Sequence, residues 1–215
     1  MINSNLAVIA LGLSKRWADM GMNSRITKHF PRVLESMGIK SWQGVKMLEY
    51  GNQIYRGKNA PFKTAKEYFE SLGVFHVSVD KNGKDGALPL DLTQPLQGIG
   101  EPFDIVTNFE TTEHVKHGQY QPFKTMHDMI RPGGMMVSVV PETGFLAKHS
   151  YFHYTKEFFR DLAILNYYKI HLLQSEAHFK VERNLVIFIA EKVTDLDFID
   201  EKSFDITFKH VEVMK

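Results

Sequence analysis

The chain has 215 residues, of which 43% are hydrophobic and 24% charged, and its formal net charge is +1. Such a chain can bury a full globular core, while the balanced charge argues against a strongly basic nucleic-acid-binding face. The absence of cysteine excludes disulfides, thiolate metal sites and a cysteine nucleophile. No run approaches the roughly 18 apolar residues of a membrane span. Basic residues follow the short apolar stretch at 7–13, whereas a signal peptide would carry them in front, so we expect a soluble, cytoplasmic protein.

Helical and strand patterns alternate along the chain. In the first half we predict, in order, a helix over 23–38, a strand over 46–50, a helix over 61–72, a strand over 74–79 and a short third strand over 87–92. In the second half we predict a strand over 103–108, a helix over 120–130, a strand over 135–140, a helix over 155–165 and strands over 168–173 and 184–191. The tail over 204–213 alternates apolar and polar residues, which favours an added edge strand.

The predicted strands are apolar runs, a pattern typical of a parallel sheet that is covered on both faces. We therefore expect an α/β, Rossmann-like fold: a mainly parallel seven-stranded sheet with helices on both faces and an antiparallel last strand. We divide the chain into an N-terminal helical extension (1–40), a cofactor-binding domain (41–192) and a C-terminal extension (193–215).

Acidic residues stand at or near the ends of successive predicted strands. Glu49 closes the first, Asp80 the second and Asp91 the third, and Glu110 follows the fourth. Ligands of open α/β sheets bind at the carboxyl ends of the strands, so these acids predict one shared binding crevice. Asp80 suits a ribose, whose two hydroxyls a carboxylate can accept, although it equally suits the cap of the turn that follows it.

Two motifs resemble those of class I S-adenosylmethionine-dependent methyltransferases. The segment FDIVTNFETTEHV at 103–115 resembles the fourth-strand motif of the branch that includes the ubiquinone-biosynthesis O-methyltransferases. The segment IRPGG at 130–134 resembles the turn that precedes the fifth strand of that family. The resemblance covers about residues 46–165 and implies S-adenosyl-L-methionine as the cofactor.

The resemblance also implies a set of cofactor-binding residues. Those that match the family's positions, or neighbour them in the first loop, are Glu49, Gly51, Asn52, Gln53, Asp80, Asp91, Leu92, Asn108, Phe109 and Glu110. Glu49 and Gly51 match the acid and first glycine of the loop that contacts the methionine end of the cofactor, and Asp80 matches the ribose-binding acid. The chain departs from the family at Gln53, where a second glycine is usual, and a side chain there narrows the approach to the backbone.

Histidines are the candidate catalytic and substrate-binding residues. His114 can take a proton from a hydroxyl that is being methylated, since imidazole titrates near neutral pH; the alternative is a purely structural part in its loop. His149 and His153 follow the fifth strand and are candidates for substrate contact, or are ordinary loop histidines. The histidines are dispersed without a metal-binding motif, so we predict no metal site.

Together these patterns predict a methyltransferase that acts on a small molecule, at oxygen. Two alternatives stay open: a cofactor-binding or regulatory protein that has lost turnover, and an aminopropyl-transfer or nucleotide-sugar enzyme on the same fold. A nucleic-acid partner is not indicated, because the Asn-Pro-Pro-Tyr-like tetrapeptide of base-modifying relatives is absent. The sequence predicts no membrane partner and leaves the oligomeric state open.

Overall fold

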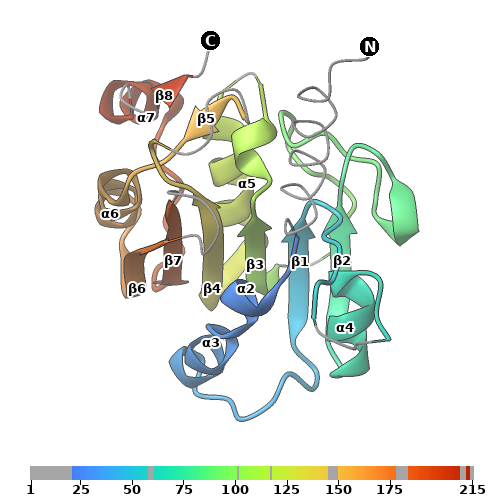
Figure 1. The fold of residues 1–215 in the computed structure, drawn as a ribbon. Helices are drawn as coiled ribbons and strands as arrows, with labels where there is room; N and C mark the ends of the chain where they lie inside the picture. The colour runs from blue at the N-terminus through green and yellow to red at the C-terminus, as the bar shows by residue number, and fades with distance from the viewer. Residues whose placement is uncertain are drawn as a thin grey trace, which may run out of the picture.

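The computed structural model describes residues 21–57, 61–100, 102–116, 118–144, 150–177, 184–208 and 212–213. Six strands form one sheet in the order β2-β1-β3-β4-β7-β6 (Figure 1). Their bounds are β1 Lys46–Tyr50, β2 Phe75–Val79, β3 Phe103–Phe109, β4 Ile130–Pro141, β6 Tyr168–Ala177 and β7 Asn184–Lys192. A separate two-stranded sheet joins β5 (Phe152–His153) to β8 (Glu212–Val213).

The main sheet is mostly parallel, as expected. Strand β1 pairs parallel with β2 and β3, and β3 pairs parallel with β4. Strand β7, the last of this sheet in chain order, runs antiparallel to both β4 and β6. The carboxyl ends of β1, β2 and β3 therefore meet at one edge, the upper edge in Figure 1.

The predicted third strand over 87–92 is not formed, and the described residues place six strands in the main sheet where seven were expected. Only a parallel bridge between Val79 and Leu88 remains at this edge. Leu88 donates its backbone N–H to Ser78 and accepts from the N–H of Asp80. The next residue is Pro89, which lacks an N–H to continue the ladder.

Side chains at alternate positions of the strands pack into two separate hydrophobic clusters. Leu48 and Tyr50 of β1 lie in one hydrophobic cluster, while Met47 lies in the other. Helices α5 (Tyr120–Met129), α6 (Lys156–Leu165) and α7 (Glu201–Thr207) contribute to the first cluster, and α2 (Ser24–Thr27), α3 (Phe30–Ser36) and α4 (Ala65–Ser71) to the second. This division follows from the two-residue period of a strand.

The tail was predicted as an edge strand over 204–213, and this is wrong for residues 204–207. Residues 201–207 form helix α7, and the two residues of β8 pair with β5 rather than with the main sheet. Asp200 caps the helix by accepting a hydrogen bond from the backbone N–H of Ser203. Phe204 and Phe208 are four residues apart, so a helix buries both on one side while Ile206 stays exposed.

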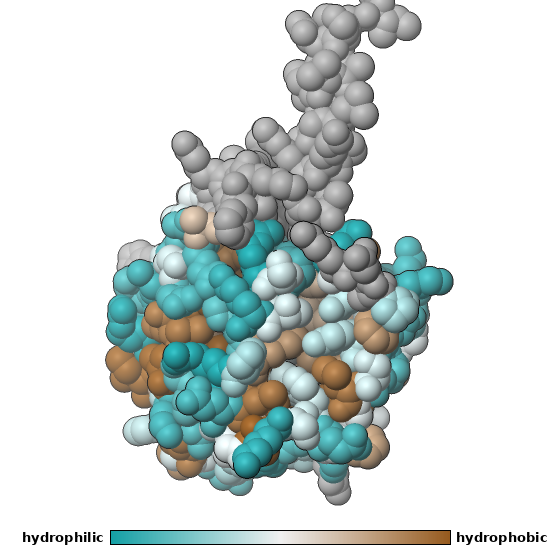
Figure 2. Space-filling model, turned by 60° about the horizontal axis from the view of Figure 1, so that its bottom comes forward, coloured by the Kyte–Doolittle hydropathy of each residue, from teal (hydrophilic) through white to brown (hydrophobic). Residues whose placement is uncertain are grey.

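The surface is mixed in character. Figure 2 shows hydrophilic and hydrophobic side chains interspersed over the face turned towards the viewer. Within the described part of the chain, no helix has the length and apolar character needed to cross a membrane.

Candidate functional site

A cavity of about 630 Å³ opens at the carboxyl ends of β1, β2 and β3. This size lies in the range of roughly 300–1,000 Å³ that is usual for small-molecule sites. The lining residues come from the end of β2, from the loops after the three strands and, for Tyr151, from the segment just before β5: Asn52, Gln53, Val79, Asp80, Lys81, Leu90, Asp91, Leu92, Thr93, Glu110, Thr111, His114, Val115, Lys116 and Tyr151. It thus gathers seven of the predicted site residues: Asn52, Gln53, Asp80, Asp91, Leu92, Glu110 and His114.

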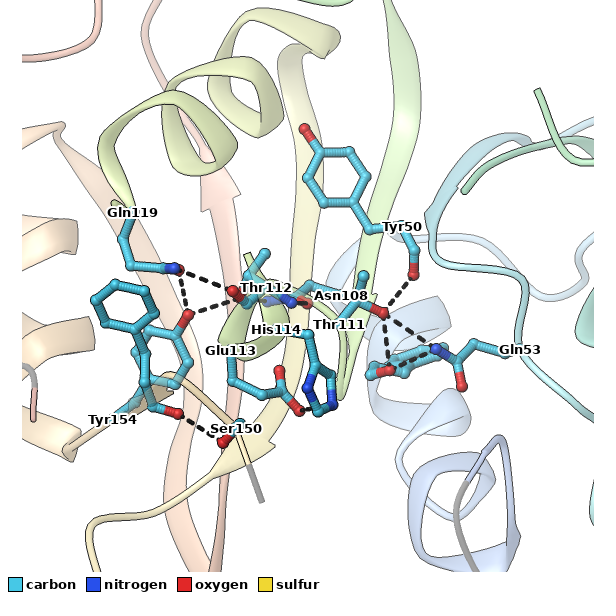
Figure 3. Close-up of polar contacts among 12 residues, drawn as sticks. Tyr50, Gln53, Asn108, Thr111, Thr112, Glu113, His114, Gln119, Ser150 and Tyr154 are labelled. Atoms are coloured by element: carbon cyan, nitrogen blue, oxygen red, sulfur yellow. Dashed lines mark hydrogen bonds and ion pairs between the residues drawn. The ribbon is translucent and has the colours of Figure 1, made fainter. Parts of the chain in front are cut away.

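The loop after β1 is hydrogen-bonded to the end of β3 through side chains. Nε2 of Gln53 donates to the backbone carbonyl of Phe109 at 2.6 Å and to Oγ1 of Thr111 at 3.1 Å. The Thr111 hydroxyl in turn donates to the carbonyl of Tyr50 at 2.8 Å. Figure 3 shows this chain of contacts. Gln53 therefore turns part of its polar surface towards β3 while it lines the cavity.

Gly51 is buried beneath this contact and does not line the cavity. Its φ of +82° lies in the left-handed region that favours glycine. A Cβ at this position would lie 2.6 Å from Oγ1 of Thr111. The close approach that requires a glycine here is thus made by a side chain of the protein itself.

Asp80 holds the loops around the cavity by accepting two backbone hydrogen bonds. One comes from the N–H of Asn52 at 3.0 Å and the other from the N–H of Asn82 at 2.9 Å. Asp80 therefore both caps the turn that follows it and lies on the cavity wall. The Asn52 side chain donates to the Lys84 carbonyl and to Asp85, while its buried Oδ1 has no hydrogen-bond partner among the described residues.

The segment 87–92, predicted as a third strand, supplies an acidic residue and an apolar residue to the cavity wall. Asp91 accepts hydrogen bonds from Lys81 at 2.8 Å and from Thr93. These bonds, led by the one from Lys81, lower the pKa of the Asp91 carboxyl to about 2, so it is ionised at neutral pH. Leu92 is 8% exposed and lines the cavity beside it.

Glu49, predicted to contact the cofactor, is fully buried and does not line the cavity. Burial raises the pKa of its carboxyl well above the usual range, which favours the neutral acid. Its nearest ionisable partner is His76 of β2, whose Nε2 lies 3.8 Å from the carboxyl oxygen. Burial lowers the pKa of His76 to about 3, so this imidazole is uncharged at neutral pH.

Asn108 and Phe109, the last residues of β3, do not line the cavity. Asn108 is fully buried and forms two hydrogen bonds with Thr112, one to the backbone N–H and one to the hydroxyl. The Thr112 hydroxyl also contacts the hydroxyl of Tyr154 at 2.8 Å, and Tyr154 donates to Gln119 (Figure 3). Phe109 is fully buried in the second hydrophobic cluster. Asn108 and Phe109, both predicted to line the cofactor, instead support the loop that follows.

That loop carries three titratable side chains in five residues. Glu110 lines the cavity with a φ of +50°, an uncommon conformation for a residue other than glycine. Burial raises the pKa of Glu110 to about 7. Glu113 is fully buried, and its pKa is raised well above the usual range by burial and then by the nearby Glu110. His114 lines the cavity, and partial burial lowers its pKa, which favours the neutral imidazole.

The other histidines do not join this group in the described structure. His153 lies on β5, is 1% exposed and is not part of the cavity wall. His149 lies outside the described residues. Among the residues that the structure describes, no three His, Asp or Glu side chains are placed to hold a metal ion.

Sequence reasoning missed several residues of the site. Thr111, Val115, Lys116 and Tyr151 line the cavity, and Gln119 and Tyr154 support it from elsewhere in the chain. The sequence could have indicated Thr111, Val115 and Lys116, because they lie close in the chain to the predicted residues Glu110 and His114. Tyr151 carried no signal, since its place depends on a backbone hydrogen bond from its N–H to the carbonyl of Glu113.

No protein-family model and no curated protein sequence matches the chain. Several solved structures are similar to it. A 1,6-didemethyltoxoflavin-N1-methyltransferase from Burkholderia thailandensis, solved with 1,6-didemethyltoxoflavin and S-adenosylhomocysteine bound, is 16% identical with a TM-score of 0.61, over 89% of this chain and 87% of that one. The N-methyltransferase NodS from Bradyrhizobium japonicum WM9 is 13% identical with a TM-score of 0.56, over 78% and 93%.

A third similar structure is a variant of the 16S rRNA (adenine(1408)-N(1))-methyltransferase from Catenulisporales acidiphilia. It is 8% identical with a TM-score of 0.50, over 78% of this chain and 93% of that one. The chain thus has a Rossmann-like α/β fold. More narrowly, it is the fold of the S-adenosylmethionine-dependent methyltransferases, with the cavity at the strand ends where ligands of such sheets bind.

Proposed function

We propose that this protein is an S-adenosylmethionine-dependent methyltransferase that acts on a small molecule, at an oxygen atom. The observation that carries the proposal is the cavity itself, which brings Asn52, Asp80, Asp91 and Glu110 together from three loops after parallel strands. The similar structures support the class of activity, since the one from Burkholderia thailandensis was solved with S-adenosylhomocysteine bound.

The residues present fit such a cofactor. Asp80 and Asp91 are carboxyl groups on the cavity wall that can accept hydrogen bonds from ribose hydroxyls and from an amine. Val79 and Leu92 offer apolar surface for a base between them. The buried Oδ1 of Asn52 has no partner among the described residues, and a bound donor group would satisfy it.

When bound, the cofactor supplies a methyl group on an activated sulfonium centre, so the protein has to position the acceptor and handle one proton. His114 lines the cavity and is neutral at neutral pH, as a general base must be. We propose that His114 removes the proton of the acceptor hydroxyl. Tyr151 and Lys116 also line the cavity, and we assign them to contact with the acceptor.

Oxygen is proposed because a hydroxyl must lose its proton to become a good nucleophile, and the cavity holds groups that can take one. The resemblance of residues 103–115 to the ubiquinone-biosynthesis branch points the same way. A nitrogen acceptor is the second candidate, favoured by the names of the Burkholderia and Bradyrhizobium enzymes.

Two measurements test the proposal. Isothermal titration calorimetry with S-adenosylhomocysteine should show one site per chain. Incubation with radiolabelled S-adenosylmethionine and a panel of phenols, hydroxy acids and amines should then label an acceptor, with hydroxyl compounds preferred. Binding without transfer to any acceptor would favour a regulatory protein, and transfer of an aminopropyl rather than a methyl group would favour the other enzyme class. The absence of binding would refute the cofactor assignment.

A further inference from the structure

Glu113 is a buried acid that the proposed reaction has not yet used. Its side chain is fully buried, and neither carboxyl oxygen makes a hydrogen bond with the described residues. His114 lies beside it, with its Nε2 3.8 Å from Oε1 of Glu113 (Figure 3). Burial of a carboxyl group without hydrogen-bond partners costs folding free energy. Its place beside the candidate base therefore calls for an explanation.

The backbone around Glu113 is held from several sides. The residue lies in the short 3-10 helix η2 (Thr112–His114). Asn108 binds both the N–H and the hydroxyl of Thr112, and Gln119 donates to the Thr112 carbonyl at 3.0 Å. The N–H of Tyr151 donates to the carbonyl of Glu113 at 2.9 Å. These bonds hold the backbone that carries Glu113, whose carboxyl group lies beside the imidazole, whereas the His114 side chain is 42% exposed.

We propose that Glu113 is a positioning residue that orients His114 for proton transfer by facing its Nε2. This inference rests on the proposed function and deepens it. With Nε2 carrying its hydrogen towards Glu113, Nδ1 is the ring nitrogen that accepts a proton from the substrate. The separation of 3.8 Å is long for a hydrogen bond, but such bonds are often long in the absence of ligands and shorten when substrate binds.

The proton balance of the step is simple. The O–H bond of the acceptor would break as its oxygen takes the methyl group, whose bond to sulfur would break with the electron pair left on the demethylated cofactor, and an Nδ1–H bond would form on His114. The hydrogen on Nε2 can then pass to the Glu113 carboxylate, which leaves a neutral acid beside a neutral imidazole. No net charge is left buried in the pair. The carboxylate is restored when the proton returns from Glu113 to Nε2 and the proton on Nδ1 leaves through the exposed side of His114.

The two side chains should therefore titrate as a unit. Burial raises the pKa of Glu113 and lowers that of His114, so both shifts favour a pair that holds one proton as a neutral acid over a carboxylate beside an imidazolium ion. The working form has lost that proton, and turnover should rise with pH through the upper apparent pKa of the pair. The other titratable groups that act on Glu113 are Glu110, which raises its pKa, and Tyr154, whose own pKa Glu113 helps to raise.

The variant Glu113→Gln tests the pairing, with Glu157→Gln as the matched control on an exposed glutamate of α6. The titration of His114 is followed by NMR in the full chain labelled with nitrogen-15 histidine, and His114→Asn assigns the signal. We expect His114 to titrate in two steps in the wild-type protein and in one step in Glu113→Gln. The control should keep the wild-type curve.

Kinetics provides the second readout. Glu113→Gln should lower kcat by about tenfold or more, while the Kd for S-adenosylhomocysteine changes less than about twofold. Glu113→Asp keeps a carboxyl group and should keep the two-step titration. If Glu113→Gln does not fold, the wild-type titration decides the pairing by showing one step or two. An unchanged His114 titration in Glu113→Gln, or a one-step titration in the wild-type protein, would overturn the pairing. The NMR result stands even if no methyl acceptor is found, so failure of the proposed function is distinguishable from failure of this inference.

Discussion

Nε2 of Gln53 lies 2.6 Å from the backbone carbonyl oxygen of Phe109, which joins the loop after β1 to the last residue of β3. The sequence placed a side chain where the family usually has a glycine, and we expected that side chain to narrow the ligand's approach. In the structure it also serves as a cross-link between two loops of the cavity. The glutamine is thus part of the architecture of the site as well as of its lining.

Replacement of Gln53 by alanine should destabilise the protein. The change removes the hydrogen bonds to Phe109 and Thr111 and leaves the carbonyl of a buried residue with one donor fewer. We expect the free energy of unfolding to fall by about 1–3 kcal/mol. Urea unfolding measures this, with Gln97→Ala as the control because Gln97 is exposed. Equal stability of the two variants would mean that the cross-link contributes nothing.

Replacement of Asp80 by alanine should weaken cofactor binding. Asp80 lies on the cavity wall and also holds the Asn52 and Asn82 amides. Loss of charged hydrogen bonds of roughly 1.5–3 kcal/mol corresponds to a rise of about tenfold or more in the Kd for S-adenosylhomocysteine. Calorimetry measures the Kd, and Asp205→Ala on the exposed side of α7 is the control. A folded Asp80→Ala protein with the wild-type Kd would remove Asp80 from the binding site.

Glu110 should make the stability of the protein depend on pH. Its pKa in the folded protein is about 7, above the ordinary value of 4.5, so the folded state keeps the proton that the unfolded chain loses between these values. Stability due to this group is therefore complete at low pH and is lost as the pH rises towards 7. At pH 8 the loss is about 3 kcal/mol.

The variant Glu110→Gln removes this dependence. It should unfold at nearly the wild-type denaturant concentration near pH 4.5 and be more stable than the wild type by up to about 3 kcal/mol at pH 8. The exposed Glu35→Gln on α3 should show no such divergence. Parallel curves for Glu110→Gln and the wild-type protein across this range would show that Glu110 ionises as an ordinary surface acid.

Replacement of Phe204 by alanine should show that the tail belongs to the core. Phe204 is 3% exposed, and its ring lies 4.5 Å from that of Phe208 and 5.6 Å from that of Tyr120. We expect a loss of about 3–5 kcal/mol from the lost burial and the cavity left behind. The control on the same helix is Ile206→Ala, since Ile206 is 57% exposed and its truncation should change stability by less than about 0.5 kcal/mol. If both variants changed the free energy of unfolding by a similarly small amount, helix α7 would not be part of the cooperatively folded core.

Local sequence patterns predicted much of the sheet because buried parallel strands are short apolar runs between polar loops. Strand β1 was predicted at residues 46–50, and the structure has it there. The prediction of an edge strand in the tail failed because Phe204, Ile206 and Phe208 fit a two-residue period. Phe204 and Phe208 also fit a helical period. The cap at Asp200 and the aromatic partners of the core decide between the two, and the partners come from distant parts of the chain.

The site was predictable in its location and less so in its detail. The rule that ligands bind at strand ends led to Glu49, Asp80, Asp91 and Glu110, of which all but Glu49 line the cavity. Gly51 was read as room for a ligand, whereas Thr111 fills that room. Contacts between residues 60 positions apart leave no trace in a single sequence, so such side-chain packing had to come from the structure.

The hydrogen bonds of Thr112 have a consequence for how the loop after β3 moves. Its backbone N–H donates to the buried Oδ1 of Asn108 at 3.1 Å, and its carbonyl is held by Gln119 from the start of α5. Exchange of this amide proton with deuterated water should require opening of the surrounding core, rather than fraying of a surface loop. The Thr112 amide should then exchange about as slowly as those of β3, and a flexible, lid-like motion of the loop would have to pivot outside Thr112.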